Sequence, residues 1–555
     1  MKYRWHLAGC IVIFQAFTLV TVYHRQVSIV SFVSWIGSIV TTYYLLCPRG
    51  PESKNRFIER KDWIYIVILC TIGLGLLWYF SAVTSHYHQD EFITAYTSWS
   101  LPGLTSIDWF AAYPPVWVSQ FPIVFHILQK PFFLILGPTL NAIRISVWPY
   151  VILITFALYG TAKTLFSRKT AVVALFVYVF FAPHLYLSSM GLHFVSSTAF
   201  LNLMLMELAR FIETKQTRRA LLAGIWSGLS YLTYTSSYVA YPVLCSVLIV
   251  SFLIIRKKYI LDGLTKATIV TAMVLAPFLV YALRVNNFFG QRVDQVNIFW
   301  GSWQDNTSAG PVLNRILIHG FDAIGALYQP GVGGLGGYNF GKLGLLDPFS
   351  LSLILLGILF LVILAVRKQW QSWFILIALG IPFVSGYILT THPPPFHRLS
   401  IVYPTLALCI ALGIDRITKH GKRYYLLLAL LSLTIILGFT HAREMILADA
   451  RIYPQNSRVI GDYLNNHTQE QQAIMIASYP SFYLGQELLF RTNNHLELIS
   501  DDTEKILKQY SGGTLILLQP SMETKTLLQD RFPSYRFITN LGGTSLGDLA
   551  LFVPK

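Results

Sequence analysis

Two adjacent carboxylates, Asp90 and Glu91, are the residues in this sequence best placed for chemistry. They follow an apolar run that ends at Ala82, and two histidines, His86 and His88, stand just before them. Ionisable groups close to a membrane-spanning segment are costly and mark functional sites. A carboxylate there could act as a general base that takes a proton from an attacking hydroxyl. The structural alternative is that Asp90 is the N-cap of an amphipathic helix.

Basic and imidazole side chains at other apolar run ends could bind an anionic group. A guanidinium grips phosphate in a two-pronged geometry, which makes Arg398 the first candidate and Arg144 the second. The structural alternatives are an interfacial arginine that extends its head to water and a surface charge at a helix start. His397 and His193 lie near the ends of apolar runs and are further candidates for anion or substrate binding. Lys130 and the nearby His126 lie inside an apolar run and could face the acceptor or the lipid phosphate, but we expect solvent-facing positions on an amphipathic helix.

Metal binding is a further option for the segment before Glu91. His86, His88, Asp90 and Glu91 could together ligate a divalent cation. The five cysteines lie in or beside apolar runs, and neither a CxxC motif nor a Cys/His metal spacing occurs. No metal site is therefore assigned from the sequence.

The composition identifies a polytopic membrane protein. Of 555 residues, 54% are hydrophobic and 12% charged, whereas soluble domains carry about 25% charged residues. The net charge of +16 is concentrated in residues 1–442, with 32 Lys/Arg against 14 Asp/Glu. These basic residues lie in short loops between apolar runs, as the positive-inside rule requires, so nucleic-acid binding is not needed to explain them.

The apolar runs predict about thirteen transmembrane helices. The run Val116–Gly137 is long enough to span, but crossing would turn most of the basic loops outward. We therefore expect it to be a re-entrant or interfacial helix within one outer segment, 83–144. The predicted spans are His6–Tyr23, Val27–Cys47, Trp63–Ala82, Ile145–Phe166, Ala171–Tyr186, His193–Ile212, Ala220–Ser236, Tyr241–Ile255, Ala267–Val285, Pro348–Val366, Trp373–Thr390, Ser400–Ile417 and Tyr424–His441.

The spans divide the chain into three parts. Residues 1–62 hold two helices and a basic cytoplasmic loop, and residues 63–442 form the main transmembrane domain with outer loops 83–144 and 286–347. Residues 443–555 alternate strand-like and helical stretches, which predicts a small extracytoplasmic α/β domain. Its strands are expected at 473–478, 514–519, 535–540 and 550–554, and its helices near 455–466, 481–491, 502–510 and 521–531.

The order of several short motifs resembles the GT-C glycosyltransferases, in particular the protein O-mannosyltransferase and aminoarabinose lipid A transferase (ArnT-like) family. The resemblance covers about residues 63–442, so the fold it implies is GT-C-like, and it departs from the family in one place. The loop His184–His193 lacks the acidic residue that many members carry there. The matching motifs are Asp90-Glu91, Pro114-Pro115, Phe133–Gly137, Arg144-Ile-Ser, Leu165–Lys169, Phe181-Ala-Pro183 and Arg398–Pro404 followed by Ala407–Gly413.

The resemblance implies an inverting membrane enzyme that moves a sugar from a polyprenyl-phosphate donor to a hydroxyl acceptor. It implies further that Asp90 is the catalytic base and Glu91 its partner, and that the reaction takes place on the outer face of the cytoplasmic membrane. Arg398, Arg144 and His397 would hold the donor phosphate, and His88, His193 and Lys130 the substrates. Two alternatives remain: a transporter or flippase of lipid-linked sugars, and a surface-polysaccharide ligase or polymerase.

Overall fold

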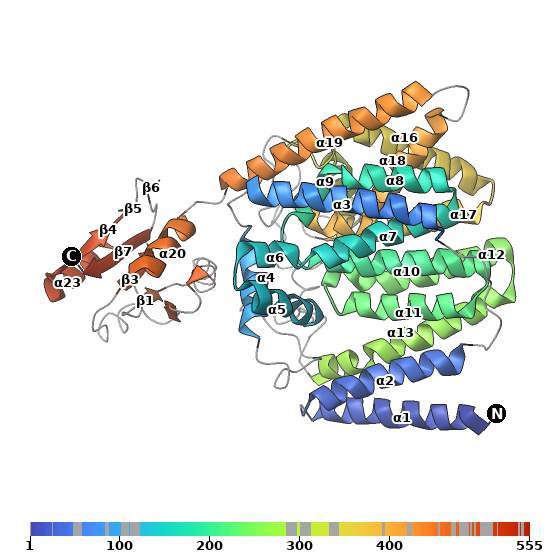
Figure 1. Ribbon diagram of the computed structural model, residues 1–555, viewed down its shortest axis with the longest axis horizontal. Coiled ribbons are helices and arrows are strands. Elements are labelled where there is room, and N and C mark those ends of the chain that lie inside the picture. The colour runs from blue at the N-terminus through green and yellow to red at the C-terminus, as the bar shows by residue number, and fades with distance from the viewer. Residues whose placement is uncertain are drawn as a thin grey trace.

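The computed structural model is a helical bundle with a small α/β domain at one end (Figure 1). It describes residues 2–24, 26–47, 58–83, 88–101, 110, 123–284, 297–299, 312–331, 343–390, 395–418, 424–452, 456–467, 473–476, 488, 491–492, 496–499, 514–518, 520–541, 544–545 and 549–554.

Within these residues, eleven helices are long and apolar enough to cross a membrane, and one bent helix pair would make a twelfth. The chain is therefore a multi-pass membrane protein. The helices of the bundle are α1 (Lys2–Tyr23), α2 (Ile29–Leu46), α3 (Arg60–Val83), α7 (Trp148–Leu165), α8 (Arg168–Val179), α9 (Ala182–Ser188), α10 (Phe194–Thr214), α11 (Thr217–Tyr231), η1 (Thr235–Val239), α12 (Ala240–Ile255), α13 (Lys258–Arg284), α16 (Pro348–Val366), α17 (Trp370–Phe383), η4 (Val384–Ile388), η5 (Phe396–Val402), α18 (Tyr403–Thr418) and α19 (Tyr424–Ile452).

Each of the thirteen predicted spans corresponds to a helix or to a pair of consecutive helices. Two of them differ from a regular span. The helices α8 and α9 form the bent pair, with an angle of 56° between them. The helix α11 has fifteen residues, which is shorter than the roughly 20 needed to cross the hydrocarbon core, so it is not among the eleven.

The described part of the predicted non-crossing segment, residues 123–137, contains the short helix α5 (Val124–Leu136), which has thirteen residues. It lies with α4 (Gln89–Ser100) and α6 (Leu140–Ile145) across the end of the bundle where α3 ends, as Figure 1 shows. Gly137 ends α5 with φ +72°, a conformation open to glycine, and Thr139 caps the start of α6. We call this the α4 end of the bundle.

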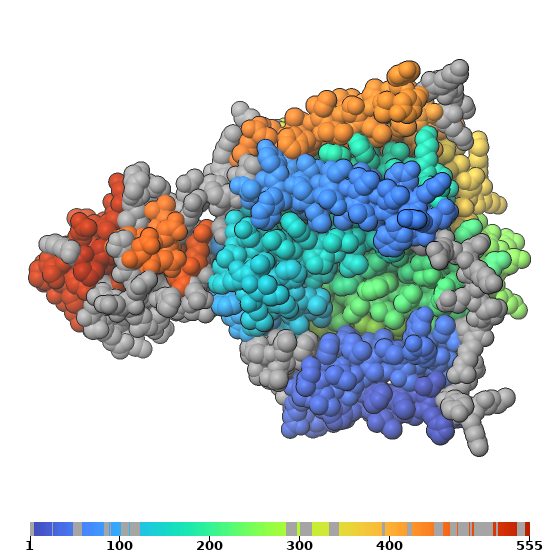
Figure 2. All heavy atoms as spheres, in the orientation of Figure 1, coloured from blue at the N-terminus to red at the C-terminus, as the bar shows by residue number. Residues whose placement is uncertain are grey.

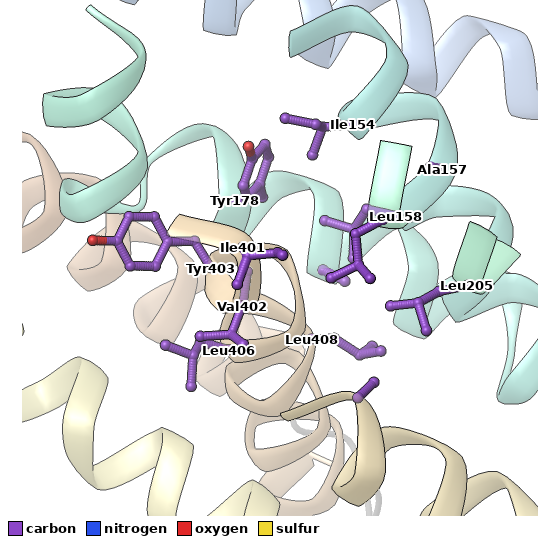
Figure 3. Close-up of a cluster of buried hydrophobic side chains, with 14 of the residues drawn as sticks. Ile154, Ala157, Leu158, Tyr178, Leu205, Ile401, Val402, Tyr403, Leu406 and Leu408 are labelled. Atoms are coloured by element: carbon purple, nitrogen blue, oxygen red, sulfur yellow. The ribbon is translucent and has the colours of Figure 1, made fainter. Parts of the chain in front are cut away.

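The core of the bundle surrounds α10, whose central membrane-length window is entirely buried. A helix that is buried on all sides needs neighbours on all sides. Figure 3 shows side chains of α7, α8, α10, η5 and α18 meeting there, among them Leu158, Tyr178, Leu205 and Val402. The start of η5 and the start of α10 are joined by the ring of Phe194, which stacks on that of His397.

The C-terminal domain has a five-stranded mixed sheet in the order β2-β1-β3-β7-β4. The pairs β1–β2 and β1–β3 are parallel, whereas β7 pairs antiparallel with β3 and β4. The predicted α/β fold and four strands are confirmed, and β2 was not predicted. The elements are α20 (Asn456–His467), β1 (Ala473–Ile476), β2 (Leu496–Ile499), β3 (Thr514–Leu518), α23 (Met522–Arg531), β4 (Tyr535–Ile538), β5 (Asn540–Leu541), β6 (Thr544–Ser545) and β7 (Leu549–Pro554).

The domain lies beyond the α4 end of the bundle, on the same side as α4, α5 and α6 (Figures 1 and 2). The predicted helices near 481–491 and 502–510 fall largely or wholly outside the described residues, as does most of the outer loop 286–347. Within that loop, the structure describes α15 (Val312–Gly325).

Candidate active site

The first turn of α4 carries Asp90 and Glu91. The residue that caps this helix is His88, whose Nδ1 accepts the backbone N–H of Asp90 at 3.2 Å. The carboxylate of Glu91 accepts the backbone N–H of His88 in return, at 3.3 Å. This is a reciprocal capping box in which a histidine replaces the usual Ser or Thr. The expectation that Asp90 is the N-cap is therefore wrong.

Glu91 is completely buried and paired with Arg144 of α6. The Nε atom of Arg144 donates to Oε1 at 3.1 Å, and Nη2 donates to Oε2 at 3.3 Å. The backbone N–H of Gly191 adds a third donor at 2.8 Å, and Arg144 also donates to the Ser81 carbonyl at 2.6 Å. The Glu91–Arg144 pair thus joins α3, α4, α6 and the segment before α10.

Asp90 has different surroundings from its neighbour. Successive residues of an α-helix point about 100° apart, so the two side chains leave α4 in different directions. Asp90 is half-buried, whereas Glu91 has no exposed surface. The pair therefore divides into an anchored carboxylate and one that is partly accessible at the α4 end.

Gly191 lies where the α9–α10 connection touches α6. An added Cβ there would collide with Cγ2 and the carbonyl oxygen of Ile143. The absence of a side chain is what allows its N–H to reach Glu91. The loop His184–His193, which has no acidic residue of its own, is thus held by Glu91 of α4.

A polar network ties α5 to α4. The Ser98 hydroxyl lies 2.8 Å from Nδ1 of His126 and donates to Oε1 of Gln129 at 2.6 Å. The amide of Gln129 donates to the Ser146 hydroxyl at 2.9 Å. Burial lowers the pKa of His126 to about 4, so the imidazole is neutral near pH 7.

Lys130 extends the same network. Its ammonium donates to the Trp99 carbonyl at 3.3 Å and to the Leu101 carbonyl, at the C-terminal end of α4. Burial lowers its pKa. The solvent-facing positions expected for His126 and Lys130 are wrong, because both side chains are buried against α4.

The third group of predicted residues lies where α10 meets η5. His193 precedes α10, and its Nδ1 lies 3.4 Å from the Thr94 hydroxyl of α4. The ring of Phe194 stacks on His397 with centroids 4.7 Å apart. Arg398 follows His397 and is buried, rather than extended along an exposed surface. The Thr94–His193–Phe194–His397 contacts thus connect the helix of Asp90 with the segment of Arg398.

The C-terminal domain also touches α4. The guanidinium of Arg491 lies over the Phe92 ring at 5.4 Å from its centroid, within cation–π range. Tyr96, one turn further along α4, packs against the buried cluster that contains Ile460 and Leu464 of α20. The helix that carries Asp90 therefore lies between the bundle and this domain.

The described residues contain no group of three His, Cys, Asp or Glu side chains close enough to hold a metal ion. His86, one of the four proposed ligands, lies outside them.

Sequence reasoning did not identify Gly191, Ser98 or Gln129. A signal for Gln129 was present, because an amide inside an apolar run needs a buried partner. Gly191 offered no such signal, since the need for a glycine arises only from the approach of Ile143.

Three comparisons place this geometry among known proteins. Residues 120–281 match the family described as dolichyl-phosphate-mannose-protein mannosyltransferase, and this segment includes α5, α6 and the start of α10. No curated protein sequence matches the chain.

Solved structures share the architecture at low sequence identity. The chain is similar to ArnT from Cupriavidus metallidurans bound to undecaprenyl phosphate, with a TM-score of 0.59 and 11% identity over 89% of this chain and 98% of that chain. It is also similar to the Archaeoglobus fulgidus oligosaccharyltransferase in the apo form, with a TM-score of 0.52, 13% identity and coverages of 83% and 70%. The archaeal oligosaccharyltransferase AglB from the same organism, in complex with an inhibitory peptide and a dolichol-phosphate, gives a TM-score of 0.50, 12% identity and coverages of 89% and 74%. The shared fold is GT-C.

Proposed function

We propose that this chain, a membrane glycosyltransferase with the GT-C fold, moves a sugar from a polyprenyl-phosphate donor to a hydroxyl acceptor. The oxygen of the acceptor forms a bond to the anomeric carbon while the bond from that carbon to the phosphate oxygen breaks. The acceptor proton passes to the carboxylate of Asp90, and polyprenyl phosphate leaves. Attack from the face opposite the leaving group inverts the anomeric centre.

The observation that carries this proposal is the difference between Asp90, which is partly accessible, and Glu91, which is fully buried and paired. A general base must be accessible to the acceptor and held in place. Asp90 is half-buried on the first turn of α4, and the neighbouring Glu91 fixes that turn through Arg144, Gly191 and His88. Glu91 is accordingly a positioning residue in this proposal, and Arg144 acts with it rather than on the donor phosphate.

Arg398 is the proposed phosphate ligand. Its segment, η5, packs on the first turns of α10, and the His397–Phe194–His193 contacts connect it with α4. A guanidinium can neutralise the leaving phosphate and hold it through two parallel hydrogen bonds. The two similar structures that hold undecaprenyl phosphate and dolichol-phosphate support a lipid-phosphate donor.

The reaction is proposed to take place at the α4 end of the bundle, on the extracytoplasmic face of the cytoplasmic membrane. Basic loops at the opposite end of the predicted spans support this orientation through the positive-inside rule. The C-terminal domain would lie on the same face, beside α4. In this proposal it contributes to acceptor binding and holds no catalytic group.

A donor panel tests the proposal directly. Purified protein in lipid nanodiscs would be given radiolabelled polyprenyl-phosphate sugars and a mixture of hydroxyl acceptors, with Asp90→Asn as the matched control. We expect transfer of label with at least one donor and none with the variant. Movement of intact donor across liposomes without any transfer would instead favour a flippase.

A further inference from the structure

An apolar cavity lies next to the candidate active site. It has a volume of about 340 Å³ and is lined by side chains of α2, α5, α11 and α13 together with Phe110. All of its lining residues are apolar, so nothing in its wall could hold a sugar, a phosphate or a peptide backbone. A hydrocarbon chain is the ligand class that such a lining accepts.

One wall of the cavity comes from the N-terminal helix α2, which lies outside the part of the chain that resembles the family. Trp35, Ile36, Ile39 and Val40 recur at helical spacing and form an apolar stripe along α2. Trp35 is buried, and the ring of Phe110 meets it edge-on at 5.5 Å. The stripe therefore faces the cavity and not the surface of α1.

Specific hydrogen bonds join α1 and α2 to α13. Pro277 has no N–H, so the carbonyl of Met273, four residues earlier, lacks its usual helical donor. The amide of Gln15 in α1 donates to that carbonyl at 3.3 Å, and Nε1 of Trp35 donates to the Val274 carbonyl at 3.1 Å. Pairing polar groups in this way inside a bilayer holds α1 and α2 against α13.

The helix α5 separates the cavity from the candidate active site. Val124, Ile127 and Leu128 line the cavity. On the other side of the same helix, His126 meets Ser98 of α4, and the ring of Phe125 lies 6.0 Å from that of His193. A molecule whose head lies beside α4 and whose tail is apolar could therefore extend past α5 into the cavity.

The cavity opens sideways. Its inner residues Ile39 and Phe278 are buried, whereas Ile36, Val40 and Leu128 at its rim keep 40%, 46% and 46% of their surface exposed. This rim lies on apolar helix surface, which a bilayer covers. A long chain could therefore fill the cavity and continue into the membrane.

We propose that this cavity binds part of the isoprenoid chain of the donor and so selects donors by chain length. The proposal rests on the proposed function and adds a lipid-binding role for α2, which α1 holds in place. Burying apolar chain in the cavity favours binding, so a filled cavity separates long-chain from short-chain donors by at least about tenfold.

Cavity-filling variants test this proposal. Ile39→Trp and, independently, Leu229→Trp would fill the cavity from α2 and from α11. Val33→Trp is the matched control, because Val33 is on α2, is 61% exposed and lies outside the cavity. Transfer would be measured with one sugar on a long polyprenyl phosphate and on a two-isoprene analogue.

We expect each cavity variant to lower kcat/KM for the long donor by about tenfold or more while changing the short donor less than twofold. Val33→Trp should leave both values unchanged. Equal losses for the two donors, or no loss, would overturn the proposal. A co-purifying phospholipid lost only from the cavity variants, with an unchanged donor ratio, would assign the cavity to a bilayer lipid instead.

A long donor carrying a photoreactive group beyond its second isoprene unit provides a second readout. Labelled peptides from α2 or α11 are expected, and labelling confined to other helices would contradict the proposal. The proposed function fails separately, since it requires the wild-type protein to transfer sugar from at least one polyprenyl-phosphate donor whatever its chain length.

Discussion

Arg144 and Glu91 form a buried, two-pronged ion pair, with Nε–Oε1 at 3.1 Å and Nη2–Oε2 at 3.3 Å. The residues are 53 positions apart in the chain and come from α6 and α4. Glu91 also receives the N–H of Gly191, so one carboxylate joins three segments around the turn that carries Asp90. The geometry of the candidate base therefore depends on a residue that need not touch substrate.

Glu91→Gln should destabilise the protein more than it slows transfer. The substitution keeps the shape but leaves the Arg144 guanidinium buried without its counter-charge, and breaking a buried pair costs about 3–5 kcal/mol. Thermal unfolding in detergent should show a clearly lower Tm, with transfer reduced but measurable. Asp90→Asn serves as the comparison and should show the reverse pattern. A wild-type Tm for Glu91→Gln would contradict the anchoring role.

Gly191→Ala should lower both stability and activity, because the new methyl group collides with Ile143 and moves the N–H away from Glu91. Overpacking of this kind typically costs about 1–3 kcal/mol. Gly75→Ala in α3 is the matched control, since a Cβ there meets nothing within 4 Å. Tm and initial transfer rates of the two variants decide the matter, and equal behaviour would contradict the steric account.

Acidification should destabilise the protein partly through His126. Its folded pKa of about 4 lies below the unfolded value of 6.5, so between these values the unfolded state binds the extra proton. The contribution of neutral His126 to the free energy of unfolding is fully present above about pH 6.5 and decreases as the pH falls toward 4. His126→Asn keeps a partner for Ser98 but does not titrate. The Tm difference between pH 7.5 and pH 5 should therefore be smaller in the variant than in the wild type.

Arg398→Lys should weaken donor use while the protein stays folded. Lysine keeps the charge but loses the planar fork, and charge-assisted pairs of this kind are worth about 1.5–3 kcal/mol. The effect is measured as the KM for the donor in Arg398→Lys divided by that in the wild type, and Tm shows whether the variant stays folded. Arg367→Lys is the control, an exposed arginine at the end of α16. Unchanged donor affinity in Arg398→Ala would remove this residue from the site.

The sequence predicted the elements well because membrane helices follow from apolar run length. Loop charge predicted that the segment of α5 does not cross, and the thirteen-residue length of α5 agrees with that prediction. It also singled out Asp90, Glu91, Arg144 and Arg398 as candidate site residues. It could not reveal that Arg144 pairs with Glu91, because contacts over 53 residues depend on packing. The buried positions of His126 and Lys130 were missed for a related reason. The polar face of α5 packs against the polar face of α4, and in the sequence alone such a face has the same pattern as one that is exposed to solvent.

The most direct test of the account is the transfer rate of Asp90→Asn, measured beside donor binding and Tm. Asparagine matches aspartate in size but cannot accept the acceptor's proton, and general-base catalysis is worth about 10²–10⁴ in rate. We expect transfer to fall by about that factor with donor binding and Tm close to wild type. A fully active Asp90→Asn protein would contradict the mechanism, and an inactive Glu91→Gln protein with normal stability beside it would exchange the roles of the two carboxylates.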